Sequence, residues 1–156
     1  MELETMKSLG MMGAAAAIGI SAVGSSIGMG FTGPAALGAW KKAYAQGKGA
    51  IFSIMVFVGC PLSQTIYGFI LMNAIVSKIN ALPPEATFCS WAAYLGAGIF
   101  GGLGIGASSW FQAVICASAI DTVCDTGKGF ANGLMVMGIA ETIALFVLVF
   151  TMMNLP

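Results

Sequence analysis

The sequence predicts an all-α membrane protein with four transmembrane helices, arranged as two tandem antiparallel hairpins. Two observations support this prediction: 58% of the 156 residues are hydrophobic and only 8% are charged, whereas soluble domains typically carry about 25% charged residues. The few charges divide the chain into four apolar stretches. Each exceeds the ~20 residues that a helix needs to cross the hydrocarbon core of a bilayer. Open strands are excluded, because their edges would lack hydrogen-bond partners in lipid.

The four stretches run over about residues 9–40, 50–77, 88–120 and 129–153. They are joined by the short connections "KKAYAQGKG", "KINALPPEAT" and "DTVCDTGK", so consecutive helices must be antiparallel neighbours. We therefore expect a first hairpin over residues 1–78, a second over residues 79–156, and both termini on one side of the membrane.

The distribution of lysines predicts the orientation. Four of the six basic residues fall in the first and third connections, which are therefore expected to be cytoplasmic, with both termini on the opposite side. These four are Lys41, Lys42, Lys48 and Lys128, and the other two are Lys7 and Lys78. The N-terminal segment "MELETMKSLG" is acidic and does not resemble a signal peptide, so residue 1 onward is expected to be mature protein.

Composition also argues against several classes of function. The formal net charge is zero, so no nucleic-acid partner is expected. The four cysteines form no C-x-x-C pair and the chain has no histidine, which argues against a zinc site and favours buried thiols that pack as small hydrophobes.

Small residues crowd the first and third stretches, in "GAAAAIGISAVGSSIGMGFTG" and "GAGIFGGLGIGASS". In a membrane, such residues let helix backbones approach closely. Here they cover nearly every face, which favours the crowded inner ring of a homo-oligomer over packing within one monomer.

The two halves of the chain resemble each other. Setting Leu62 against Glu141, an offset of 79 residues, also pairs Gly59 with Gly138 and Tyr67 with Phe146. The offset is close to half the chain length, as a duplicated hairpin requires.

Glu141 lies at the midpoint of the fourth apolar stretch. A carboxylate at that depth costs several kcal/mol unless it has a partner. The chain has no arginine, and its six lysines lie at the ends of the stretches, so no internal salt bridge is available. Glu141 is therefore neutral and structural, or it has a function supported by neutral polar groups.

The second stretch offers such groups in "CPLSQTIYGF". Cys60, Ser63, Gln64 and Tyr67 follow the spacing i, i+3, i+4 and i+7, which places them on one face of a helix. Pro61 removes a backbone donor and thereby frees carbonyl groups, which a cation could bind.

Gln112, on the third stretch, lies within about one helical turn of the depth of Glu141. Together these residues form a set of hard oxygen ligands with a single negative charge, which suits Na⁺ better than a divalent ion. A proton would need only the carboxyl group and one acceptor, so the additional oxygens favour Na⁺ over H⁺. The alternative is that Ser63, Gln64 and Gln112 only hydrogen-bond between helices.

The segments "PLSQTIYGF" (61–69) and "GIAETIALF" (138–146), within the Gly-rich duplicated hairpins, resemble the proteolipid K (c-type) subunit of V-type ATPases. They are most similar to the bacterial sodium-pumping members, which have a P-x-[ST]-Q-x-x-Y-G-F pattern and a similar interval between Gln112 and Glu141. The resemblance covers all four stretches. It implies a rotor ring of identical four-helix subunits, with the first and third helices inside and the ion sites on the outer face.

The resemblance also implies a set of sodium ligands. These are Glu141, Gln112, Gln64, the Ser63 hydroxyl and the Cys60 main-chain carbonyl, with Tyr67 hydrogen-bonded to Glu141. Ser63 and Cys60 stand where the family has threonine and leucine. The first keeps a hydroxyl and the second contributes only backbone, so the expected ligand atoms are the same.

The expected function is that of a rotor subunit, non-catalytic by itself, which carries Na⁺ across the plasma membrane of a bacterium. No G-x-x-x-x-G-K-[ST] motif occurs, so ATP is expected to be hydrolysed by a soluble head that contacts the ring through central-stalk subunits. Since the chain has no arginine, the cation that displaces Na⁺ must come from a stator subunit.

The alternatives are a proton-translocating rotor, a tetraspan scaffold or pore, and a small multidrug carrier. The tryptophans lie mostly near the ends of the stretches, where an interfacial belt explains them better than a carrier's substrate pocket does.

Overall fold

The computed structural model describes residues 1–83 and 85–156, and these are helical apart from short connections. The long helices are α1 (Leu3–Ala45), α3 (Ser63–Asn80), α4 (Trp91–Thr126) and α5 (Phe130–Met153). The short helices η1 (Phe52–Ile54), α2 (Met55–Gly59) and η2 (Cys60–Leu62) lead directly into α3. Four helical runs are long and apolar enough to cross a membrane: α1, the run Phe52–Asn80, α4 and α5. The predicted all-α fold with four spans is confirmed.

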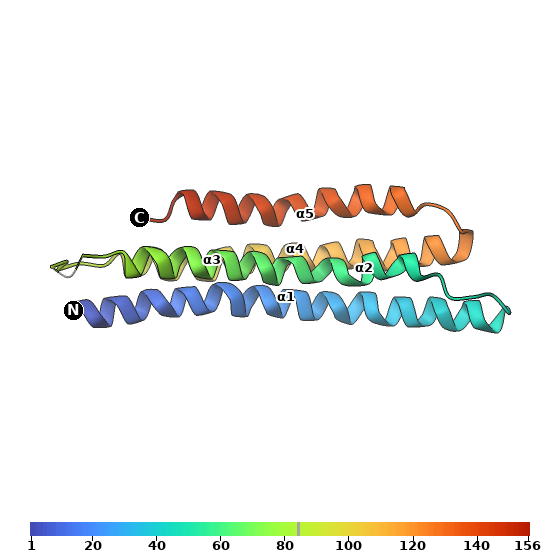
Figure 1. Cartoon of the computed structure of the whole chain (residues 1–156), viewed down its shortest axis with the longest axis horizontal. Coiled ribbons are helices and arrows are strands. Elements are labelled where there is room, and N and C mark those ends of the chain that lie inside the picture. Colours follow the sequence, from blue (N-terminus) through green and yellow to red (C-terminus); the bar gives the residue numbers. More distant parts are fainter. Residues whose placement is uncertain (84) are drawn as a thin grey trace.

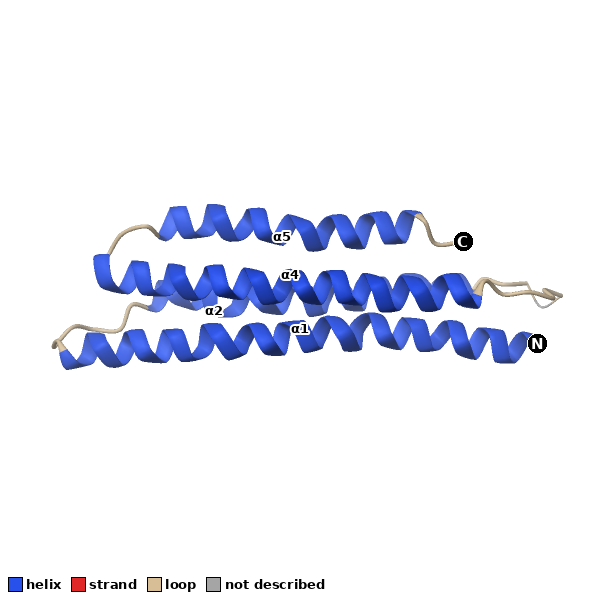
Figure 2. Ribbon diagram, turned by 180° about the vertical axis from the view of Figure 1, so that it is seen from behind, coloured by secondary structure: helices blue, strands red, loops and turns tan. Residues whose placement is uncertain are grey.

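The four spans lie side by side along the long axis of an elongated bundle (Figure 1). Both termini lie at one end, and the α1–α2 and α4–α5 connections lie at the other. Helices α1 and α5 lie on opposite sides of α3 and α4, which form the middle of the bundle (Figure 2). The most extensive packing is between α1 and α4, which are the first and third spans.

The helices extend beyond the apolar stretches predicted from the sequence. α1 begins at Leu3 and continues through Lys41 and Lys42, and α4 continues to Thr126. The predicted limits were placed where charges begin, but a helix outside lipid can continue through polar residues. Here Lys42 Nζ lies 2.6 Å from Asp125 Oδ1, so the two extended ends also contact each other.

Glycines bring the backbones of α1 and α4 into direct contact. A Cβ atom added to Gly24 would overlap the backbone of Gly106, and one added to Gly98 would overlap the carbonyl of Gly13. By contrast, a Cβ on Gly19 would meet nothing within 4 Å. The small residues are thus required on one face of each helix, where close approach replaces the hydrophobic effect as the source of stability.

Candidate ion-binding site

The predicted site residues come from three of the four spans. Glu141 lies on α5 and Gln112 on α4, while η2 and the first two turns of α3 supply the remaining groups. Gln64 and Gln112 are fully buried, whereas Ser63, Tyr67 and Glu141 are half-buried.

The Glu141 carboxylate accepts hydrogen bonds from two side chains. The Tyr67 hydroxyl donates to Oε1 over 2.7 Å. Gln112 Nε2 donates to Oε2 over 3.4 Å and also lies 3.4 Å from the carbonyl oxygen of Met137, one turn earlier on α5. Each carboxylate oxygen therefore has one neutral donor, so the charge is held without a basic residue.

The two buried amides continue this network across the bundle. Gln64 Nε2 donates to Gln112 Oε1 over 2.8 Å. The Ser63 hydroxyl lies 3.1 Å from Gln64 Oε1 and 2.9 Å from the carbonyl oxygen of Cys60. A continuous chain of polar contacts thus connects the Cys60 carbonyl with Glu141, and it contains every group that the sequence analysis singled out as a ligand.

The electrostatics of the site are set by its single carboxylate. In the described part of the chain, the two ion pairs lie near helix ends, between Lys7 and Glu4 and between Lys42 and Asp125. No cluster of three or more His, Cys, Asp or Glu side chains occurs among the described residues. The site therefore has the chemistry of hard neutral oxygens around one negative charge, which suits a small monovalent cation or a proton.

Pro61 breaks the second span as predicted, but the freed carbonyls have partners that the sequence analysis missed. The helix tightens to a 3₁₀ turn over Cys60–Leu62. The Ser109 hydroxyl donates to the Pro61 carbonyl over 2.9 Å, and the Thr32 hydroxyl donates to the Val58 carbonyl over 3.2 Å. Hydroxyls on α4 and α1 thus occupy these two carbonyls, whereas the Cys60 carbonyl, which the sequence analysis assigned to the cation, accepts from the Ser63 hydroxyl of the network.

A second hydroxyl of α4 anchors α5 beside the carboxylate. Ser108 donates to the carbonyl oxygen of Ala140, the residue before Glu141, over 3.0 Å. Neither Ser108 nor Ser109 stood out in the sequence, since both lie in a stretch where small residues are common. The signal available was their position within one turn of Gln112.

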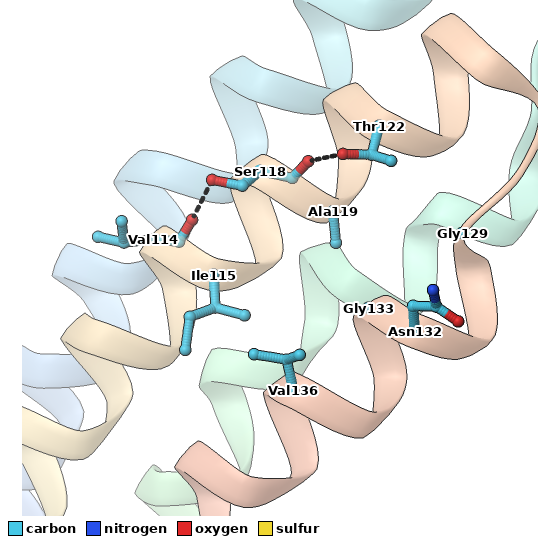
Figure 3. Close-up of a pocket in the computed structure, with 9 residues that line it drawn as sticks. All are labelled: Val114, Ile115, Ser118, Ala119, Thr122, Gly129, Asn132, Gly133 and Val136. Atoms are coloured by element: carbon cyan, nitrogen blue, oxygen red, sulfur yellow. Dashed lines mark hydrogen bonds between the residues drawn. The ribbon is translucent and has the colours of Figure 1, made fainter.

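A groove of about 420 Å³ lies between α4 and α5, nearer the end where these helices are connected. It is lined by nine residues, including Ile115, Ala119, Gly133 and Val136, and by none of the site residues (Figure 3). The two hydroxyl groups on its wall donate to carbonyls of their own helix. Apart from the Asn132 side chain, the groove is therefore lined mainly by apolar groups, and it is separate from the polar network.

The chain is similar in sequence to known membrane proteolipids, and the similarity includes the site residues Gln112 and Glu141. Residues 95–153 match the family model of the ATP synthase C subunit, and this segment contains both Gln112 and Glu141. The chain is also 30% identical over 138 residues to the A-type ATP synthase subunit K of Methanocaldococcus jannaschii. That alignment covers 88% of this chain and 57% of the relative, so the chain spans little more than half the length of that relative. With four apolar spans and a carboxylate hydrogen-bonded to neutral side chains in the matched segment, the chain is similar to the membrane proteolipids of the ATP synthase C-subunit family.

Proposed function

We propose that this chain is the rotor-ring subunit of a V-type or A-type rotary ATPase and that it carries Na⁺ at Glu141. The observation that supports this function best is the network of Gln112, Gln64 and Ser63 around one carboxylate between apolar spans. The subunit is non-catalytic: it binds the ion, while other subunits of the complex hydrolyse or synthesise ATP.

The choice of Na⁺ rests on the number of oxygens in the site. The carboxylate, the two amide oxygens, the Ser63 hydroxyl and the Cys60 carbonyl form a set large enough to replace the hydration shell of a small cation. One positive ion also neutralises the single negative charge, which makes passage through lipid less costly. To bind Na⁺, the Gln112 carboxamide must turn its oxygen toward the ion, because its nitrogen now faces Glu141.

A proton rotor is the second candidate, and one observation favours it. Tyr67 and Gln112 already satisfy both carboxylate oxygens of Glu141 without a cation. A protonated Glu141 would need only one neighbouring group to accept its O–H, such as the Tyr67 hydroxyl oxygen, and no further ligands. The two candidates share their architecture and differ only in whether Gln64 and Ser63 bind an ion.

The proposed cycle needs groups that this chain lacks. A loaded site stays neutral while it turns past lipid, and a cation on a stator subunit attracts Glu141 and releases Na⁺. That cation is an arginine of the stator subunit, because this chain has no arginine and its lysines are near helix ends or in connections. We place the subunit in a plasma membrane of a bacterial cell, as a ring of identical copies. Its first and third connections face the cytoplasm and the central stalk, and both termini lie on the opposite side.

We further propose that the chain consists of two hairpins that arose by duplication, over residues 1–78 and 79–156. In this division only the second hairpin retains the ion-binding acid. The division falls in the last turns of α3, which ends at Asn80.

Carbodiimide labelling of Glu141 in isolated membranes tests the choice of ion. The reagent attacks a protonated carboxyl group, so bound Na⁺ protects Glu141 at fixed pH. We expect protection by NaCl and none by KCl. Labelling that is equally fast with and without Na⁺ would contradict the sodium proposal and support the proton rotor. Glu141→Gln is the control that assigns the label, and Glu85→Gln, in the exposed connection between the hairpins, is the matched control that must label normally.

A further inference from the structure

Ser25 on α1 is the one buried side chain in the described part of the chain whose polar atom has no hydrogen-bond partner. Its side chain is 2% exposed. Leaving a buried hydroxyl unpaired is unfavourable, so a serine there requires a physical reason. Ser21, one turn earlier, shows the ordinary solution, since its hydroxyl donates to the carbonyl of Ala17 over 2.7 Å.

The packing of α1 against the second span places Ser25 level with Gln64. Three glycines show which residues of the two helices face each other. A Cβ atom added to Gly10 would lie 2.8 Å from Ile79 Cδ1, and one added to Gly68 would lie 2.6 Å from Ser21 Cβ. A Cβ atom added to Gly28 would lie 2.6 Å from Pro61 Cβ. In each pair the residue numbers add up to 89, which defines one antiparallel register along the whole interface. The same register pairs Ser25 with Gln64.

Helix α4 packs against the same part of α1, next to Ser25. The α1 residues on either side of Ser25 contact α4, since Gly24 lies against Gly106 and Gly28 lies against Ala113. Ser25 is therefore enclosed where α1, α3 and α4 meet, at the depth of the polar network.

Gln64 has an unused donor at this position. Its amide nitrogen carries two N–H groups, and in the described residues it has one acceptor, Gln112 Oε1. Gln64 is fully buried, so bulk solvent at the surface of the bundle does not supply the missing acceptor. A donor without an acceptor on α3 and a hydroxyl without a partner on α1 thus lie in the same register.

We propose that Ser25 is a positioning residue of the ion site and that its hydroxyl accepts the second N–H of the Gln64 carboxamide through one buried water molecule. Such waters typically bind buried polar groups that would otherwise be unsatisfied. This contact fixes the rotation of the amide, so that Gln64 Oε1 stays beside the Ser63 hydroxyl and the Cys60 carbonyl. The inference rests on the proposed function, because it assigns to the first span a role in binding the transported cation.

The test is the NaCl concentration that gives half-maximal protection of Glu141 against carbodiimide, measured on assembled rings. Ser25→Ala should raise it roughly tenfold, as expected for the loss of one buried hydrogen bond. Ser26→Ala is the matched control and should leave it unchanged, because the Ser26 hydroxyl is exposed and donates to the carbonyl of Ala22. Equal values for the wild type and Ser25→Ala would overturn the inference and leave the sodium site intact.

A double-mutant cycle separates positioning from a general effect on packing. If Ser25 acts through Gln64, the double variant Ser25→Ala/Gln64→Ala should match Gln64→Ala alone. Additive effects would overturn the inference. If Ser25→Ala rings do not assemble, Ser25→Cys keeps the volume with a weaker hydrogen-bonding group and should give an intermediate value.

If Na⁺ does not protect the wild-type protein, the sodium proposal fails, and the same cycle is measured on the pH dependence of labelling without Na⁺. The contact with Gln64 then predicts shifts in the same direction for Ser25→Ala and Gln64→Ala that do not add. An unshifted pH profile for Ser25→Ala would overturn the inference in this case too.

Discussion

The second and fourth spans occupy equivalent places in the two hairpins, yet they contribute opposite parts of the site. The second span is broken into η1, α2, η2 and α3, and it contributes neutral groups: a carbonyl, a hydroxyl, an amide and a phenol. The fourth span, α5, is one continuous helix and contributes the only charge. Most large apolar side chains of α5 are exposed on the surface of the single chain.

If the two hairpins arose by duplication, as proposed above, the second and fourth spans have specialised in complementary ways. In the alignment of the two halves, Leu62 takes the place of Glu141. Leu62 is 50% exposed, whereas Glu141 is half-buried within the network. In the second span it is the next two residues, Ser63 and Gln64, that belong to the network.

The largest effect should come from exchanging the two side chains, Leu62→Glu with Glu141→Leu. We expect complete loss of ATP-driven sodium uptake by membrane vesicles, because residue 62 is exposed and is not part of the polar network. Glu85→Gln is the control that should retain uptake. Sodium-protected labelling at residue 62 would contradict the prediction and would show that the halves are interchangeable.

A smaller effect should come from the neutral side of the site. Gln64→Leu keeps the volume but removes one proposed ligand and leaves Gln112 Oε1 buried without a donor. We expect the NaCl concentration for half-protection of Glu141 to rise about tenfold to a hundredfold, which corresponds to about 1–3 kcal/mol. Thr65→Val, at the next position, should have little effect. If Gln64→Leu had no effect, the amides would be structural and the proton rotor would be favoured.

The members of the polar network were predictable from the sequence because they follow a helical spacing and because polar residues are scarce inside the apolar stretches. Ser63, Gln64 and Tyr67 follow a helical spacing, and Gln112 is a rare amide in its span. In a chain with so few polar groups inside apolar stretches, these had few possible partners other than Glu141.

The supporting hydroxyls were not predictable in the same way. Thr32 and Ser109 bind the carbonyls of Val58 and Pro61, and these contacts depend on the registers of three helices. Those registers are set by the close approach of glycines such as Gly24 and Gly106. Small residues occur on nearly every face of α1 and α4, so no sequence pattern distinguished the face that makes contact.

The third prediction concerns the break in the second span. Ser109→Ala leaves the Pro61 carbonyl without its donor, which should destabilise the folded chain by about 1–3 kcal/mol. The thermal midpoint of the purified ring in detergent measures this loss. Ser118→Ala removes a hydroxyl of the same helix that donates to the Val114 carbonyl and is exposed, so its midpoint should stay near that of the wild type. Equal midpoints for the two variants would show that the break needs no support from α4.

The smallest effect is expected from Tyr67, whose counterpart in the other half is Phe146. Tyr67→Phe removes the 2.7 Å hydrogen bond to Glu141 Oε1. Because the pair is half-buried, we expect the free energy of Na⁺ binding to weaken by about 1 kcal/mol. Sodium protection of Glu141 should then require about fivefold more NaCl. Labelling without Na⁺ should be faster, because the carboxylate has lost a donor that stabilises its charged form.

Phe146→Tyr adds a hydroxyl at the equivalent position, but Phe146 is 58% exposed, so neither the NaCl requirement nor the labelling rate should change. If Phe146→Tyr also altered labelling, the two outer spans would be less different than their contacts indicate, and a hydroxyl of α5 would reach the ion site from the outer face.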